Sequence, residues 1–307
     1  MDLQGCGTAL VTPFRADGSI DERALYDFAR WQVESGIDWL LACGTTAETP
    51  TLDDGEWLQV IRIVAEAAAG RVPVWAGCSH NATRVAVARA RAAAQIPGVK
   101  ALLTANPWYN KPTQEGQFQH FRAVAQAVKL PVVLYNIPGR SAANLEPATV
   151  LRLIEAAPNI AGIKESSGNL VQVTELITEA PRSFRIYSGD DMMALGVLGV
   201  GGSGLISVIS NIIPGEMAHM IRSALRNDWP TARRINRKYF RLMQGLFRET
   251  SPGPVKAVLA MMGKMGENYR LPMVPVSAGT HAYLERLAGE LGLLVHGPRI
   301  EGEVRMF

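Results

Sequence analysis

Eight short runs of apolar residues recur at nearly constant intervals between residues 7 and 208, separated by longer amphipathic stretches. Each run is rich in Val, Ile, Leu and Ala, which is typical of parallel strands that are covered on both faces. The runs comprise residues 7–12, 37–43, 72–78, 99–105, 131–137, 160–164, 184–188 and 204–208. This pattern predicts a parallel sheet with helices packed against it.

The stretches between the runs have helical periodicity. In residues 21–35, for example, Leu25, Phe28, Ala29 and Val33 share one face. The other predicted helices cover residues 53–69, 82–94, 114–128, 146–157, 170–179, 191–200 and 215–226. Eight such units close naturally into an α/β fold of the (β/α)8 TIM-barrel type, which we favour over a doubly wound open sheet.

No strand-like run follows the eighth unit. Three further helices are predicted over residues 229–247, 253–265 and 275–291. Because no linker-like composition separates them from the preceding residues, we expect a barrel over 1–227 and a helical appendage packed on it over 228–294. Residues 295–307 lack periodicity, so we expect a poorly ordered tail there.

Charge and composition argue against several classes of protein. Lys and Arg total 31 against 28 Asp and Glu, without a basic run, so nucleic acid is not an expected partner. No stretch approaches the roughly 20 apolar residues that cross a bilayer, and the N-terminus lacks a signal-peptide pattern. We therefore expect a cytoplasmic protein that does not associate with membranes.

The cysteines and histidines do not predict a metal site. Three cysteines and five histidines are scattered without metal-ligand spacing, and we expect the cysteines to be small buried apolar residues. The glycine-rich residues 201–204 are compatible with a phosphate cradle or with a plain tight turn, but no dinucleotide fingerprint accompanies them. We expect no cofactor.

The active site of such a barrel lies at the carboxyl ends of its strands, so the polar residues that close the apolar runs are the candidates. They occur in residues 44–48, 106–110, 135–140, 164–166 and 188–191.

Lys164 is the only one of the seven lysines that ends a strand-like run. Strand alternation predicts that Ile160, Gly162 and Lys164 share one face and that Gly162 leaves room beside the ammonium group, directed either into the barrel or toward the helices. A buried amine is favoured as the free base, which attacks a carbonyl to form a Schiff base. The alternative is a structural lysine paired with Glu165 or with another strand-end carboxylate, Asp190.

Schiff-base chemistry also needs proton transfer, and no histidine occurs among the strand-end residues. Tyr135 closes the neighbouring strand and is the candidate for proton transfer. The alternative is that Tyr135 is a packed aromatic residue whose hydroxyl has a hydrogen-bond partner. Thr45 and Thr46 offer hydroxyl and backbone N–H groups to a substrate carboxylate, unless they form a plain turn. Arg140 is able to bind a second carboxylate, although a surface arginine is the default.

Four motifs stand in order at these strand ends. They are Gly44-Thr45-Thr46-x-Glu48, Pro107-x-Tyr109-Asn110-Lys111-Pro112, Tyr135-Asn136-x-Pro138-x-Arg140 and Gly162-Ile163-Lys164-Glu165-Ser166. In this combination the chain resembles the dihydrodipicolinate synthase family of pyruvate-dependent class I aldolases, from about Gly5 to Leu294.

The resemblance implies a lyase that condenses pyruvate with L-aspartate-4-semialdehyde to give 4-hydroxy-tetrahydrodipicolinate, on the route to diaminopimelate and lysine. Lys164 would form the Schiff base and Tyr135 would transfer protons. Thr46 and Tyr109 would complete a relay, with Tyr109 reaching across a tight dimer into the neighbouring site. Family members are usually homotetramers, dimers of such dimers, built partly through the C-terminal helices.

The resemblance also implies a set of substrate-binding residues. The backbone of Thr45 and Thr46 would receive the pyruvate carboxylate, and Arg140 that of the semialdehyde. Ile206 and Gly189 would line the pocket. The alternatives are another Schiff-base aldolase or dehydratase of the superfamily, acting on a sialic acid, a 2-keto-3-deoxy sugar acid or 4-hydroxy-2-oxoglutarate, and a pseudoenzyme that only binds pyruvate.

Two positions depart from the family pattern. Ala47 stands where glycine is usual, and Ser251 replaces an asparagine common before the segment Pro252-Gly253-Pro254-Val255-Lys256. Lysine-inhibited members use a glutamate, a histidine and an aromatic residue, whose positions correspond here to Val85, Trp57 and Trp108, aligned through Asn81 and Thr49. The resemblance thus implies weak or absent inhibition by lysine.

Overall fold

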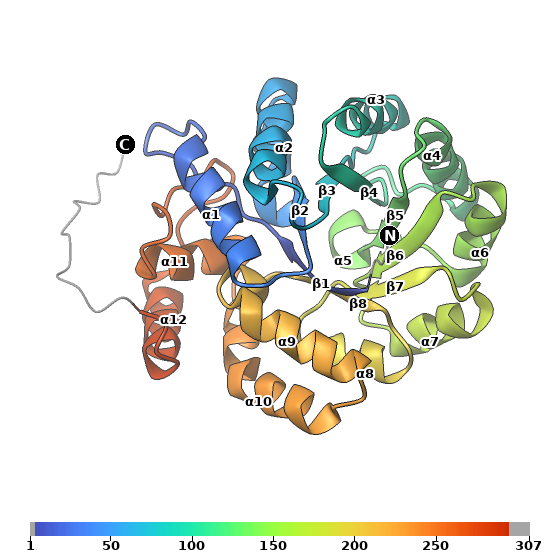
Figure 1. The fold of residues 1–307 in the computed structure, drawn as a ribbon. Coiled ribbons are helices and arrows are strands. Elements are labelled where there is room, and N and C mark those ends of the chain that lie inside the picture. The colour runs from blue at the N-terminus through green and yellow to red at the C-terminus, as the bar shows by residue number, and fades with distance from the viewer. Residues whose placement is uncertain (1–3, 295–307) are drawn as a thin grey trace.

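The strands form a closed parallel barrel in chain order, which confirms the predicted (β/α)8 architecture (Figure 1). The structure is a computed structural model that describes residues 4–294, so the tail predicted over 295–307 lies outside the described residues. The strands are β1 (Gly5–Ala9), β2 (Trp39–Ala42), β3 (Val74–Gly77), β4 (Val99–Ala105), β5 (Val132–Asn136), β6 (Ile160–Glu165), β7 (Arg185–Ser188) and β8 (Gly204–Ser207). Pairing of β1 with both β2 and β8 closes the barrel.

The helices alternate with the strands and cover the outside of the barrel (Figure 1). They are α1 (Glu22–Glu34), α2 (Asp54–Ala68), α3 (Thr83–Ala94), α4 (Gln114–Gln126), α5 (Pro138–Ser141), α6 (Pro147–Ala156), α7 (Leu170–Glu179), α8 (Ala194–Gly199), α9 (Pro214–Leu225), α10 (Trp229–Gly245), α11 (Gly253–Met261) and α12 (Ala278–Glu290). Short 3-10 turns also occur, at η1 (Thr45–Ala47), η2 (Thr49–Thr51) and η3 (Ile209–Asn211). Within residues 4–294, no helix combines the length and apolarity needed to span a bilayer.

The first strand lies earlier in the chain than the predicted run 7–12. Its backbone begins pairing with β8 at Gly5, opposite Gly204, where a side chain on Gly204 would come within 2.1 Å of the Gly5 carbonyl oxygen. Leu10 and Val11 remain buried although they follow the strand. These two residues are therefore apolar because they pack in the hydrophobic core, although they lie outside the strand.

Two apolar layers stabilise the barrel, one between sheet and helices and one inside the sheet. The inner layer centres on three aromatic rings: Trp39 stacks on Trp75 with ring centroids 4.9 Å apart, and Tyr187 meets both edge-on at 5.6 and 5.5 Å. Close packing of these large rings makes the interior a filled core and not a channel.

The register between β5 and β6 shifts between Val132 and Val133. Ile160 consequently joins the outer layer, and the prediction that it shares a face with Lys164 is wrong. After the shift, Lys164 pairs with Tyr135 on one side and Tyr187 on the other. Because partners in adjacent strands point to the same face, and both tyrosines belong to the inner layer, Lys164 points into the barrel.

The C-terminal helices gather on one side of the barrel (Figure 1). Helix α10 packs on α9, α12 packs on both α10 and α11, and α11 contacts η3 at the end of β8. The last of these contacts brings the C-terminal segment to the face of the barrel where the strands end.

Candidate active site

Lys164 lies at the carboxyl end of β6 with its side chain inside the barrel. It is 5% exposed, and its Nζ lies 4.1 Å from the ring centroid of Tyr135. None of the ion pairs among residues 4–294 includes it. The two residues singled out as nucleophile and proton donor therefore meet, and the lysine is not held by a carboxylate in the described part of the chain.

Glu165 faces away from this amine into a polar cluster of its own. Its carboxylate accepts hydrogen bonds from Asn136 Nδ2 at 3.1 Å, from Gln172 Nε2 at 2.9 Å and from the Ser167 backbone N–H at 2.8 Å. These bonds join the ends of β5 and β6 to α7. Glu165 thus fixes the strand end on which Lys164 stands.

Gly189, after β7, leaves the room for the Lys164 side chain. A Cβ at this position would lie 2.8 Å from Cε of Lys164 and 1.9 Å from the Ser166 hydroxyl oxygen. The prediction that Gly162 fills this role is wrong, because a Cβ there would meet the backbone oxygen of Arg185 at 2.4 Å. Gly162 instead permits the close approach of β6 and β7.

Thr45 and Thr46 form the turn η1 immediately after β2. The turn is fixed from two sides: Thr12 Oγ1 donates to the Ala47 carbonyl at 2.8 Å, and Thr49 Oγ1 donates to the Gly44 carbonyl at 2.8 Å. Ala47 is buried and has an ordinary negative φ, so its methyl group is accommodated without backbone strain. The departure at residue 47 therefore leaves the turn intact.

Thr45 and Arg140 line one cavity of about 400 Å³. Ala105 and Ile137, which pack with the inner layer around Tyr135, line it as well, so the cavity reaches the top of the barrel interior. Arg140 follows β5 on the short helix α5, and its Nη2 donates to the Ser251 carbonyl at 3.1 Å. Two candidate carboxylate-binding groups thus share one space.

Of the expected site residues, Thr45 and Arg140 line this cavity, whereas Lys164, Tyr135, Thr46, Gly189, Tyr109 and Ile206 are not among its lining residues. Tyr109 is 88% exposed on the loop after β4, where its backbone has a positive φ of 72°. Its neighbour Trp108 lines the cavity, but Tyr109 is not among the lining residues. Ile206 is fully buried in the inner layer, in the same cluster as Tyr135.

Three other titratable groups near the strand ends have structural contacts. Asp191 accepts hydrogen bonds from Ser207 Oγ and the backbone of Val208 and Ile209, while burial raises its pKa to about 6. Cys43 and Cys78 are buried and unpaired, and burial raises the pKa of both thiols. Such thiols are poor nucleophiles.

Lys256 was not among the site residues predicted from the sequence; it is fully buried on α11 and lies 2.5 Å from the Glu48 carboxylate. The available signal was a single lysine within the buried apolar segment 253–259. A charge in such a segment requires a partner. Glu48 was available as that partner, because it ends the strand-end motif 44–48 and no role in the reaction was predicted for it.

Comparison with known proteins agrees with this geometry. Residues 2–290 match the family described as the dihydrodipicolinate synthetase family. The chain belongs to this family. A 4-hydroxy-tetrahydrodipicolinate synthase of Acidobacterium capsulatum is 71% identical over 97% of this chain and 99% of that protein. One of Koribacter versatilis is 55% identical over 96% and 98% of the two chains.

A solved structure shows the same fold. The dihydrodipicolinate synthase of Acinetobacter baumannii, crystallised with pyruvate, is 38% identical, covers 95% of this chain and 100% of its own, and superposes with a TM-score of 0.93. The family membership expected from the four strand-end motifs and the barrel predicted from the eight apolar runs are therefore confirmed.

Proposed function

We propose that this chain condenses pyruvate with L-aspartate-4-semialdehyde through a Schiff base on Lys164, giving 4-hydroxy-tetrahydrodipicolinate. The activity is that of the relatives at 71% and 55% identity, which favours it over the sugar-acid aldolases and the pseudoenzyme. The observation that supports Lys164 in this role is its burial against Tyr135 without a carboxylate partner among the described residues.

The reaction follows from the chemistry of an amine and a ketone. Lys164 Nζ attacks C2 of pyruvate, and the carbinolamine loses water to give the imine. Loss of a C3 proton gives an enamine, whose C3 attacks the aldehyde carbon of the semialdehyde. The amino group of the condensed product then attacks C2, closes the ring and releases Lys164 as the free amine.

The remaining residues have roles in binding and proton transfer. Tyr135 exchanges protons with the carbinolamine and the enamine, through Thr46 and a Tyr109 contributed by a second copy of the chain. The backbone of Thr45 and Thr46 holds the pyruvate carboxylate, and Arg140 holds that of the semialdehyde. Ile206 and Gly189 shape the space beside Lys164, which the contact of Gly189 with that side chain supports.

The proposal includes an assembly and a location. A homotetramer built from tight dimers is supported by Tyr109, a large aromatic residue that is 88% exposed in the single chain. A cytoplasmic location is supported by three cysteines that are all free, as is usual in a reducing compartment. We further propose that residues 1–227 and 228–294 act as barrel and appendage, supported by the start of α10 at Trp229.

Trapping with borohydride tests the proposal. Incubation with pyruvate and borohydride should add the mass of a reduced pyruvate adduct to one lysine, and peptide mapping should place it on Lys164. Lys164→Ala should abolish the adduct, and Lys164→Arg should not restore it, because a guanidinium stays protonated. An adduct that persists on another lysine would overturn the assignment. A panel of aldehydes then identifies the second substrate.

A further inference from the structure

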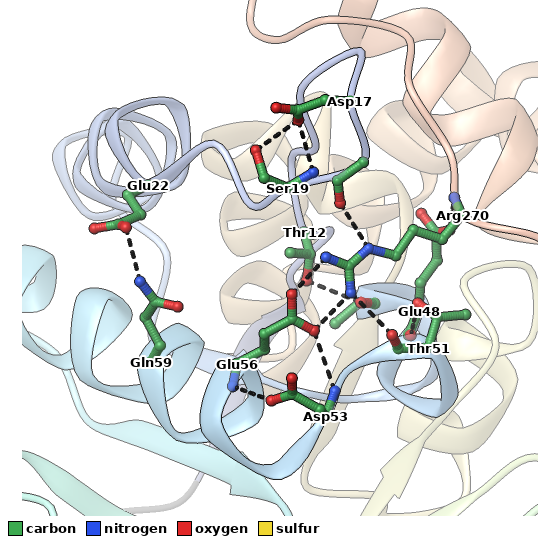
Figure 2. A network of polar contacts seen from close by, with 12 residues as sticks. Thr12, Asp17, Ser19, Glu22, Glu48, Thr51, Asp53, Glu56, Gln59 and Arg270 are labelled. Carbon is green, nitrogen blue, oxygen red and sulfur yellow. Dashed lines mark hydrogen bonds and ion pairs between the residues drawn. The ribbon is translucent and has the colours of Figure 1, made fainter.

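Glu48 belongs to the motif 44–48 but has no part in the reaction proposed above. It caps η1 in a left-handed conformation, with φ 54° and ψ 32°, and its side chain is buried. One carboxylate oxygen lies 2.5 Å from Nζ of Lys256, and the other accepts from the backbone N–H of Arg270 at 3.2 Å. Both partners come from the C-terminal part of the chain, and Figure 2 shows Arg270 beside Glu48.

Lys256 is held by this carboxylate alone among acidic groups of the described residues. Its side chain is 0% exposed, and its Nζ lies 4.5 Å from the ring centroid of Phe14 and 5.0 Å from that of Tyr269. Burial lowers the pKa of Lys256, which the adjacent Glu48 opposes. A buried charge without a partner is costly, so each member of the pair constrains the position of the other.

The pair is continuous with the Thr45–Thr46 turn. Glu48 donates its backbone N–H to the Thr45 carbonyl at 3.2 Å, and its own carbonyl accepts from Thr51 Oγ1 at 2.9 Å. Arg270 adds a second connection, because its guanidinium donates to the Thr51 carbonyl and to both carboxylate oxygens of Glu56 (Figure 2). The segment from η1 to α2 is thus tied to the C-terminal part of the chain.

The same C-terminal segment also reaches Arg140, through the Ser251 carbonyl. Ser251 and Lys256 are five residues apart. Ser251 contacts one candidate carboxylate-binding group, Arg140, and Lys256 contacts Glu48 at the end of the turn that forms the other. The segment 251–256 is therefore connected to both groups, to Arg140 directly and to the turn through Glu48.

We infer that Lys256 is a positioning residue for pyruvate, because its ion pair with Glu48 fixes the turn whose backbone N–H groups receive the pyruvate carboxylate. This inference rests on the proposed function. Lys256 itself touches no reacting atom. Its loss should weaken pyruvate binding while leaving Lys164 able to form the adduct at high pyruvate.

The test measures how borohydride trapping depends on pyruvate concentration. Lys256→Met removes the charge at nearly constant volume and should raise the half-saturating pyruvate concentration about 10-fold or more, with the trapped adduct still on Lys164. The double variant Glu48→Gln with Lys256→Met buries no unpaired charge, so it should regain thermal stability. Its half-saturating pyruvate should nevertheless stay raised, because α11 no longer holds the turn.

A matched control separates positioning from stability. Arg222 pairs with Asp38 before β2, at the opposite end of the barrel. Arg222→Met should lower the unfolding temperature without changing the half-saturating pyruvate. The inference is overturned if the double variant recovers the wild-type value, or if neither Lys256 variant changes it. Failure of the proposed function is distinct, since the wild-type chain would then form no adduct at Lys164.

Discussion

The position of the Lys164 side chain depends on a residue that has no side chain, Gly189. Gly189 does not have a positive φ, so its backbone would tolerate other residues. What it provides is space, since a Cβ at this position would lie 2.8 Å from Cε of Lys164 and 1.9 Å from the hydroxyl oxygen of Ser166. The Ser166 hydroxyl has no hydrogen-bond partner among the described residues, which leaves it available near the amine.

Gly189→Ala should disturb the amine while leaving the fold intact. The added methyl group would lie 2.8 Å from Lys164 Cε, so the side chain must shift away from its reactive position. Misplacement of this kind costs roughly 100-fold in rate, which we expect in the rate of pyruvate adduct formation. Gly279→Ala on α12 is the control, because a Cβ there meets nothing within 4 Å. Equal rates in both variants would contradict the role of Gly189.

At the scale of elements, periodicity predicted what is long and regular. Strand β4 and helix α7 have the predicted bounds, residues 99–105 and 170–179. The turn η1 and helix α5 were not predicted, because three or four residues cannot show a helical period. These short elements carry Thr45 and Arg140. The candidate residues of the site could therefore be predicted from the sequence, but the turn and the helix that position them could not. The register shift in β6 likewise depends on pairing with β5, which alternation within one strand does not reveal.

The connection from β7 to the end of β8 depends on one buried carboxylate. Asp191 accepts from Ser207 Oγ at 2.6 Å and from the backbone N–H groups of Val208 and Ile209, at the start of η3. Burial raises its pKa from 3.8 to about 6. Because the folded protein holds this proton more tightly than the unfolded chain, the group stabilises the fold fully below about pH 4, and this stability is lost as the pH rises through 6.

Asp191→Asn cannot ionise, so wild type should lose roughly 3 kcal/mol of unfolding free energy relative to this variant between pH 4 and pH 7. Thermal unfolding of both proteins across this range measures the difference. Asp228→Asn is a control for which the stability difference from wild type should change with pH in the opposite direction, because hydrogen bonds from Thr231 lower the pKa of Asp228. A pH-independent difference between wild type and Asp191→Asn would show that Asp191 is not protonated in the folded protein.

At the scale of the whole molecule, the candidate site draws on distant parts of the chain. Lys164 and Tyr135 come from adjacent strands, and Arg140 is held by Ser251 beyond the barrel. Tyr109, on the loop after β4, is 88% exposed in the single chain. A tight dimer would bring it to a neighbouring cavity, as the family resemblance implies.

Subunit complementation tests this arrangement. Tyr109→Phe and Lys164→Ala should each be weakly active alone. When they are mixed under conditions of subunit exchange, one site in each mixed dimer contains both native groups, and activity should rise. Mixing Tyr135→Phe with Lys164→Ala is the control, because Tyr135 and Lys164 of one site belong to the same chain. Each site of that mixed dimer therefore lacks one of the two groups, and both stay defective. Absence of a gain in the first mixture, with exchange verified by mass, would place Tyr109 outside the neighbouring site.

The response of this protein to lysine depends on the residues that line the cavity. Asn81 and Trp108 line it, as the resemblance implies for a lysine site, but Trp57 is 1% exposed and donates its indole N–H to the Gly77 carbonyl at 3.0 Å. Trp57 is thus a core residue and cannot replace a ligand-binding histidine.

The positive charge of the arginines that line the cavity is also unfavourable for binding an ammonium group. Apart from the Cys43 thiol, the titratable residues that line the cavity in the described chain are Arg89, Arg140 and His80, and Val85 stands where lysine-inhibited members carry a glutamate. Burial without a carboxylate would cost a bound ammonium several kcal/mol, equivalent to orders of magnitude in affinity. Millimolar lysine should therefore leave the initial condensation rate nearly unchanged, and Val85→Glu should increase whatever inhibition exists. Half-inhibition of the unaltered chain well below 1 mM would show that a carboxylate from another subunit completes the site.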